Sequence, residues 1–243
     1  MDPYTSLSTT GDLLLRERVY EYLKQVLAGG SLSPGAYLNL SALEAGLCLS
    51  RTPLRDALLR LEAEGFVTIH SRRGVLVNAL NPDAVRNIYQ IVGALEGAAA
   101  EEAAGLGGDD TWAKMESLNC GMREALTQDS FDEYYARNLT FHDSFISLST
   151  NAELRSKVRI LKERLYDFPR RKRYLRDWEL ASVQEHDQII SLFRRGDFHA
   201  ASDYLRGTHW SYALQERYIH AYYFLEATGM TTGPRDGPKA DST

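Results

Sequence analysis

Cysteine is scarce in this chain of 243 residues, which contains only Cys48 and Cys120 and no CxxC pair. We therefore expect neither a disulfide framework nor a thiolate zinc site, and a reducing cytoplasm suits this cysteine usage best. The chain also lacks a run of about 18 consecutive apolar residues, so no membrane-spanning helix and no membrane partner are expected. Residues 1–15 have no basic segment ahead of an apolar stretch, and a secretory signal is not expected.

Positive charge is not in excess, since 28 Lys and Arg residues stand against 33 Asp and Glu residues and the formal net charge is -5. This balance argues against a generally basic nucleic-acid coat protein, but it permits a local basic surface. Residues 1–79 carry eight basic and eight acidic residues, so the deficit belongs entirely to the rest of the chain. The length and the hydrophobic fraction of 44% indicate one or two globular domains.

The N-terminal block begins with two helical patterns. Apolar residues from Leu14 to Leu27 recur at helical spacing, and Gly29 and Gly30 are expected to end that helix. A short helix is expected over Ser41–Ala45, with its first residue as the N-cap and Glu44 completing a capping box.

A third helix and a hairpin are expected to complete this block. The helix is capped by Ser50 and ends at Gly65. Two β-branched runs, residues 66–70 and 75–77, flank a turn that contains Gly74, which predicts a small hairpin. This order is typical of a winged helix-turn-helix, in which the helix after the turn enters the major groove and the wing reaches an adjacent groove.

Arginines gather on the elements that would face DNA. Arg51 and Arg55 lie four residues apart at the start of the third helix and therefore share a face. An arginine fork binds guanine O6 and N7 together, and Thr52 with the helix N-terminus suits a phosphate contact. The remaining predicted contacts are Arg60, Arg72, Arg73 and Gly74. The alternative for any one of these arginines is a solvated helix face.

After Asn81 and Pro82, which suit an N-cap and a first helical position, the patterning is almost entirely helical. The expected helices cover 83–104, 109–126, 131–148, 152–166, 178–194 and 198–225. The predicted fold is thus mainly α, with an N-terminal winged helix-turn-helix and a C-terminal antiparallel all-α bundle. The expected divisions are a DNA-binding domain (1–79), a helical effector and metal domain (80–228) and a disordered tail (229–243).

Three histidines stand on three different expected helices of the bundle. Asn138 and His142 are four residues apart on one helix, His186 lies on a later helix, and His209 lies on the last. Imidazole nitrogens with an amide oxygen suit a divalent metal such as Zn, Ni or Mn. Spacing alone leaves open that each histidine is a hydrogen-bonded core residue.

Two segments of the first block carry a family resemblance. Residues 50–65 (SRTPLRDALLRLEAEG) and 71–77 (SRRGVLV) closely resemble the DNA-binding domain of GntR-superfamily transcriptional regulators. The resemblance implies that Arg51 and Arg55 read bases, that Thr52 and Arg60 support or touch the DNA backbone, and that Gly74 marks the wing tip.

The second block resembles the FCD ligand-binding domain of the FadR-like GntR subfamily, through residues 138–142 (NLTFH), the Glu-His pair ending at His186, and His209. The resemblance implies a divalent metal held by three histidines and the residue four before the first of them. That residue is commonly Asp in the family and is Asn138 here, and an amide oxygen is a weaker ligand than a carboxylate.

The effector implied by the resemblance is a small organic acid. The first bundle helix of the family often carries an Arg four residues before its Glu, where it would pair with an effector carboxylate, and here that position is Val92. The effector is then less acidic, binds through the metal, or uses Arg155 or Arg159 instead.

We therefore expect a cytoplasmic transcriptional regulator, most simply a repressor, that binds double-stranded operator DNA as a homodimer and releases it in response to a small metabolite. One alternative is a metal-dependent, hydrolase-like enzyme with an accessory DNA-binding domain. Another is a regulator whose metal is purely structural.

Overall fold

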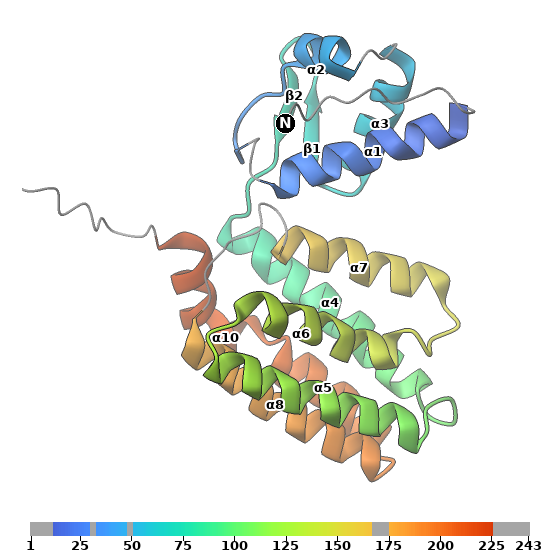
Figure 1. Cartoon of the computed structure of the whole chain (residues 1–243), viewed down its shortest axis with the longest axis vertical. Coiled ribbons are helices and arrows are strands. Elements are labelled where there is room, and N and C mark those ends of the chain that lie inside the picture. Colours follow the sequence, from blue (N-terminus) through green and yellow to red (C-terminus); the bar gives the residue numbers. More distant parts are fainter. Residues whose placement is uncertain (1–11, 30–32, 48–50, 167–174, 226–243) are drawn as a thin grey trace, which may run out of the picture.

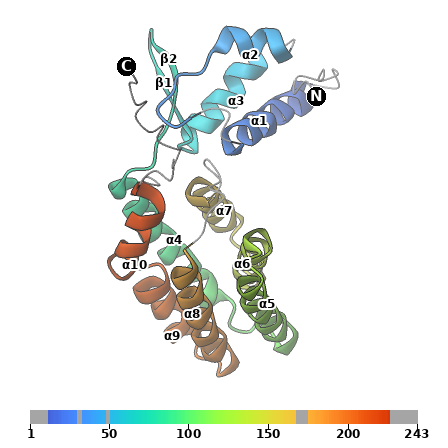
Figure 2. The same cartoon turned by 60° about the vertical axis from the view of Figure 1, so that its left-hand side comes forward.

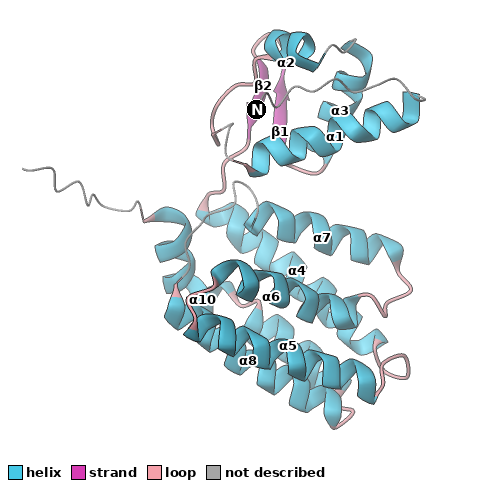
Figure 3. Cartoon of the chain, in the orientation of Figure 1, coloured by secondary structure: helices cyan, strands magenta, loops and turns pink. Residues whose placement is uncertain are grey.

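The computed structural model describes residues 12–29, 33–47, 51–166 and 175–225 (Figure 1). Ser50 and the expected tail at 229–243 lie outside the described residues. The N-terminal part contains α1 (Asp12–Ala28), α2 (Leu40–Leu47), α3 (Arg51–Ala63), β1 (Val67–His70) and β2 (Gly74–Val77). The fold class is as predicted, with helices and one antiparallel hairpin followed by a helical bundle (Figure 3).

The three N-terminal helices and the hairpin enclose one hydrophobic core, which includes Leu23, Leu61 and Val77 at 0% exposure. The predicted capping box at Ser41 is wrong. The helix α2 begins one residue earlier, and the Asn39 side-chain oxygen accepts a hydrogen bond from the Ala42 amide at 3.0 Å. Asparagine caps at least as well as serine, and its position just before the helix gives it the cap.

The hairpin joins its strands through the three-residue loop 71–73, because His70 pairs with Gly74 in the strand register. Arg72 has φ +72° and Gly74 has φ +96°. Gly74 thus begins β2 beside the loop, and Arg72 and Arg73 form the wing tip itself. Both arginines are exposed.

The C-terminal part is a bundle that opens at a capped helix, as the sequence predicts. The Asn81 side-chain oxygen accepts from the Ala84 amide at 2.8 Å and Pro82 is the first helical residue. The elements are α4 (Pro82–Glu102), α5 (Asp109–Thr127), α6 (Phe131–Ile146), α7 (Ala152–Tyr166), α8 (Arg176–Arg194), α9 (Phe198–Tyr204), η1 (Leu205–His209), α10 (Tyr212–Ile219) and η2 (His220–Phe224). None of the helices within these described ranges has the length and apolar character needed to cross a membrane.

The expected continuous helix over 198–225 is wrong. After α9 the chain makes a π-helical turn, η1, leaves helical geometry at Trp210 and resumes at α10. A π turn holds more residues than an α turn and shifts the phase of the side chains that follow. As a result His209 and Trp210, which are adjacent in sequence, both face the interior and have ring centroids 5.5 Å apart. Periodicity alone does not reveal such a turn.

The helix α7 also packs on the N-terminal part, beneath α1 in two views (Figures 1 and 2). Its Ile160 belongs to the N-terminal core cluster. The Glu163 carboxylate accepts from the Lys24 ammonium at 2.6 Å. The Arg164 guanidinium lies so close to Gly65 that a Cβ there would meet it at 2.9 Å. The helix α7 therefore packs against the N-terminal part through apolar, ionic and backbone contacts.

Candidate metal centre and DNA-binding face

The start of α3 presents a basic, solvent-exposed face. The Arg51 side chain is 89% exposed, with its nearest acidic group, Glu44 on α2, at 3.5 Å. Thr52 and Arg55 are also exposed. Leu54, Ala57 and Leu58 point into the core and hold the helix with this face outward. The predicted DNA-reading residues of α3 are thus available to a ligand.

Arg60 differs from the other predicted contacts. Its guanidinium lies over the Tyr20 ring, 3.5 Å from the centroid, and pairs with Glu17 at 2.7 Å and Glu64 at 3.1 Å. These contacts join α3 to α1. Arg60 therefore stabilises the packing of the N-terminal helices. A DNA contact for Arg60 is implied only by the resemblance to GntR regulators.

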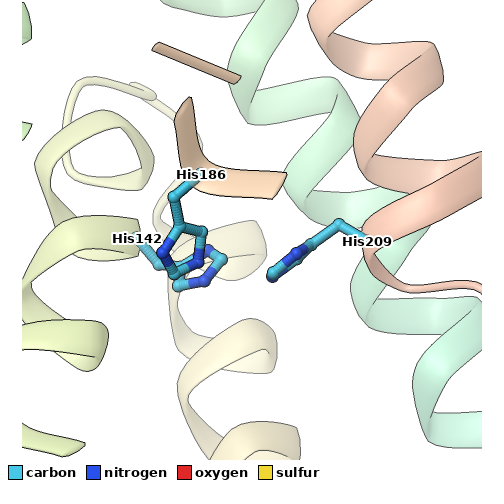
Figure 4. Close-up of side chains that lie close together, drawn as sticks. All are labelled: His142, His186 and His209. Atoms are coloured by element: carbon cyan, nitrogen blue, oxygen red, sulfur yellow. The ribbon is translucent and has the colours of Figure 1, made fainter. Parts of the chain in front are cut away.

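The structure brings together the three histidines that the sequence singles out (Figure 4). His142 on α6, His186 on α8 and His209 on η1 each offer a ring nitrogen, and these three atoms lie within 4.8 Å of one another. His142 and His186 are buried at 1% and 0% exposure. Burial lowers the pKa of His142 to about 4, against the raising effect of the Glu96 carboxylate. His142 is therefore neutral at physiological pH, the form that ligates a metal.

Each histidine is oriented by an acceptor on its Nδ1 nitrogen. His142 Nδ1 donates to Glu96 Oε2 at 2.8 Å, and His209 Nδ1 donates to Glu185 Oε2 at 2.7 Å. His186 Nδ1 donates to the Asn119 side-chain oxygen at 3.2 Å. An Nδ1–H bond of this kind leaves the Nε2 lone pair free, which is the usual arrangement around metal-ligating histidines.

The fully buried Glu96 carboxylate is the most connected of these partners. Lys162 Nζ donates to Oε1 at 3.0 Å, and Trp210 Nε1 and His142 Nδ1 each donate to Oε2 at 2.8 Å. Burial opposes ionisation of Glu96, but the charges and hydrogen bonds of these neighbours outweigh it and lower its pKa. Glu96 is therefore a buried carboxylate whose charge is balanced by one lysine.

Three buried polar atoms in the described residues have no hydrogen-bond partner: His186 Nε2, Asn138 Oδ1 and the Tyr134 hydroxyl. Buried polar atoms are rarely left unpaired. The first two belong to the predicted ligand set, and a metal ion held by the three histidines would satisfy His186 Nε2. The donor set of three imidazoles thus fits a divalent metal such as Zn or Ni, and Asn138 is the residue that could add an amide oxygen.

A cavity of about 60 Å³ adjoins the histidines, and His209 and Asn138 form part of its wall. Eight of its lining residues are aromatic: Tyr89, Phe131, Tyr134, Tyr135, Tyr166, Trp178, Trp210 and Tyr222. Its polar groups include Glu179, Ser182, Glu185 and Gln215. Aromatic walls with a few converging polar groups are the usual form of a small-molecule site.

Comparisons with known proteins agree with this architecture. Residues 15–77 match the model of bacterial regulatory proteins of the gntR family, and residues 87–208 match the FCD domain. The chain belongs to the GntR family.

Its similar proteins are transcriptional regulators. The Nta operon transcriptional regulator of Aminobacter aminovorans is 32% identical over 65% of this chain and 74% of its own length. The transcriptional repressor GlaR of Escherichia coli K12 is 27% identical over 71% of this chain and 81% of its own. A putative GntR regulator from Rhodococcus sp. RHA1 has the same fold, with a TM-score of 0.63 at 20% identity over 86% of this chain and 98% of its own.

Family membership decides between the classes left open by the sequence. This GntR protein is a transcriptional regulator of the FCD branch, and the enzyme alternative is set aside because the matching families and relatives are all regulators.

The structure places the two alternative effector-binding arginines away from the histidine cavity. Arg155 and Arg159 line a second cavity of about 470 Å³ between α6 and α7. Arg159 pairs with Glu163 at 3.0 Å, and Arg155 donates to the Ser149 carbonyl. Within the described part of this GntR protein, no lysine or arginine lines the cavity beside the metal-ligating candidates.

Sequence reasoning missed the residues that orient the histidines. Glu96 lies 46 positions from His142 and Asn119 lies 67 positions from His186, so no local sequence motif indicates these hydrogen bonds. Glu185 is the neighbour of His186 in sequence, but its carboxylate accepts a hydrogen bond from His209. The signal that existed was a Glu in the middle of an apolar helix pattern, since Glu96 stands among the buried residues of α4.

A pH prediction follows from Glu179, since burial raises its pKa to about 7 from an ordinary 4.5. Because the unfolded carboxyl ionises at lower pH, the folded protein loses stability as pH rises from about 4.5 to 7. We expect Glu179→Gln to stabilise metal-free protein at pH 8 by roughly 1–3 kcal/mol and to change little at pH 4.5. Urea midpoints at both pH values measure this, with the exposed Glu216→Gln as the control. An equal effect at both pH values would contradict the assignment.

Proposed function

We propose that this GntR protein is an operator-binding repressor that acts as a homodimer, and that a small metabolite bound beside a divalent metal in the bundle sets its DNA affinity. Residues 1–79 form the DNA-binding unit and residues 80–228 the sensing unit in this proposal. The observation that carries it is the convergence of three imidazole nitrogens beside a cavity, in a chain that also presents an exposed arginine face.

In the DNA-binding unit, Arg51 and Arg55 read base edges in the major groove and Thr52 contacts phosphate. Arg72 and Arg73 on the wing contact the backbone of an adjacent groove. Two copies related by a two-fold axis match the two half-sites of an operator.

In the sensing unit, His142, His186, His209 and the Asn138 oxygen hold the metal. A bound divalent ion supplies positive charge and open coordination positions to the cavity. The effector favours one of two dimer geometries because it binds them unequally, by about 1–3 kcal/mol, and the favoured geometry no longer fits the half-site spacing.

Arg55→Ala tests the DNA-reading face. We expect it to lower affinity for an operator, selected from random DNA by the wild-type protein, by roughly 5- to 150-fold, equivalent to about 1–3 kcal/mol. Fluorescence anisotropy with the full metal-loaded chain gives this affinity.

Arg195→Ala removes the same charge from an exposed site at the end of α8 and is the matched control. It is expected to bind the operator like wild type. If both variants lose affinity equally, the effect is one of net charge and α3 is not the reading helix.

A further inference from the structure

The cavity beside the histidines offers negative charge and aromatic faces to a ligand. Its described lining contains two carboxylates, Glu179 and Glu185, and no lysine or arginine. The nearby Lys162 is buried in its pair with Glu96 and lines the other cavity. A simple organic acid would meet two like charges there, and only the metal would favour it.

The two carboxylates are not equivalent. Glu185 accepts from His209 Nδ1 at 2.7 Å and from the Gln215 amide at 2.9 Å, so both of its oxygens are engaged. Glu179 has no lysine or arginine partner within the residues that the structure describes. The neutral Tyr134 hydroxyl is its polar neighbour and interacts with it, but brings no charge. Glu179 is therefore an acidic group in the cavity wall that no lysine or arginine of the described lining balances, and a cation beside it would favour its ionised form.

Aromatic faces complete the environment of that carboxylate. The eight rings of the wall surround a space of about 60 Å³. Aromatic faces attract cations, and ammonium groups in particular are bound by cages of such rings. A carboxylate beside them that pairs with no lysine or arginine of the described lining strengthens that preference and offsets the repulsion from a divalent ion held by the histidines.

We infer that the effector carries an organic ammonium group, and that this group lies among the aromatic rings against Glu179 while the other end of the molecule faces the metal. The inference rests on the proposed sensing role of this cavity and names its ligand class. It also departs from the organic acid that the family resemblance implies. The apolar Val92 agrees with this departure, because it stands where the family often has an arginine that would pair with an effector carboxylate. The cavity limits the ligand to a few non-hydrogen atoms.

The probe for this inference is tetramethylammonium chloride, because it has a fixed charge, fits the size limit and cannot ligate a metal. Sodium chloride at equal concentration controls for ionic strength. The nearly isosteric but neutral tert-butanol controls for shape, and glycolate represents the organic acids. Calorimetric titration and thermal unfolding of the full, metal-loaded protein measure binding.

We expect tetramethylammonium to bind and to raise Tm by about 3 °C at tenfold excess over its Kd, while tert-butanol and glycolate do not. Glu179→Gln, which keeps the shape of the side chain, should weaken tetramethylammonium binding at least about tenfold. The exposed Glu216→Gln, one residue from the cavity-lining Gln215, should leave it unchanged.

Two results would overturn the inference. One is binding of glycolate in preference to tetramethylammonium with no effect of Glu179→Gln, which would return the effector to the organic acids. The other is the absence of tetramethylammonium binding to folded, metal-loaded protein. Operator binding by the same preparation is measured in parallel. A protein that binds its operator but not tetramethylammonium would contradict the ligand class and leave the proposed regulator function standing.

Discussion

Glu96→Ala is expected to lower the free energy of unfolding by about 3–5 kcal/mol, the usual result of breaking a buried ion pair by removing one partner. The substitution leaves the Lys162 ammonium, 6% exposed, without its carboxylate. It also removes the acceptor of the His142 and Trp210 N–H groups. Urea denaturation at pH 7 gives the change, and Glu101→Ala, an exposed position on the same helix, is the control and should change little.

A double-mutant cycle separates the ion pair from the rest of the network. Lys162→Met removes the charge that Glu96 balances and keeps an unbranched side chain. The double variant Glu96→Ala with Lys162→Met is expected to lose less stability than the two single variants added together, because no unpaired charge stays buried. Additive losses, or a loss below about 1 kcal/mol for Glu96→Ala, would show that the network contributes little.

His186→Ala is expected to weaken divalent metal binding by more than about 100-fold, since loss of even an orienting partner of a metal ligand costs about 10–100-fold. It removes one of the three converging imidazoles. In wild type, added Zn or Ni should raise Tm and chelation should lower it, whereas the variant should respond to neither. Calorimetric titration with Zn or Ni gives the metal affinity of each protein, thermal unfolding gives the change in Tm, and the metal content of the purified protein is measured alongside.

His199→Ala is the matched control, because His199 is 79% exposed and lies outside the cluster. It should bind metal like wild type. If wild type itself shows no change of Tm with metal or chelator, the three histidines are core residues and the metal centre is wrong, while the DNA-binding proposal stands.

The sequence predicted those parts of the molecule that depend on local spacing. The span of α7 agrees with its expected residues, and α5 ends one residue beyond its expected end. Helical periodicity predicted the shared face of Arg51 and Arg55 at the start of α3. The convergence of the three histidines was implied by the family resemblance, since spacing alone left open that each is a core residue. The family resemblance then selected these histidines from the six in the chain.

Other features depend on contacts between distant residues or on irregular backbone, and the sequence did not predict them. The Nδ1 partners of the histidines come from different helices. The π turn at η1, which brings His209 and Trp210 to the same interior, breaks the periodicity on which helix prediction relies. The acidic, aromatic character of the cavity emerges only when α4, α6, α8 and α10 are assembled.

The helix α7 is shared by both halves of the molecule, and this sharing sets how one half senses the other. Ile160 lies in the N-terminal core, and two residues later Lys162 is held by the carboxylate that orients His142. A rigid helix cannot move at Lys162 without moving Ile160 and Glu163, because all three lie within one turn. In the proposed dimer, this 15-residue helix would couple the position of each recognition helix to the histidine cluster.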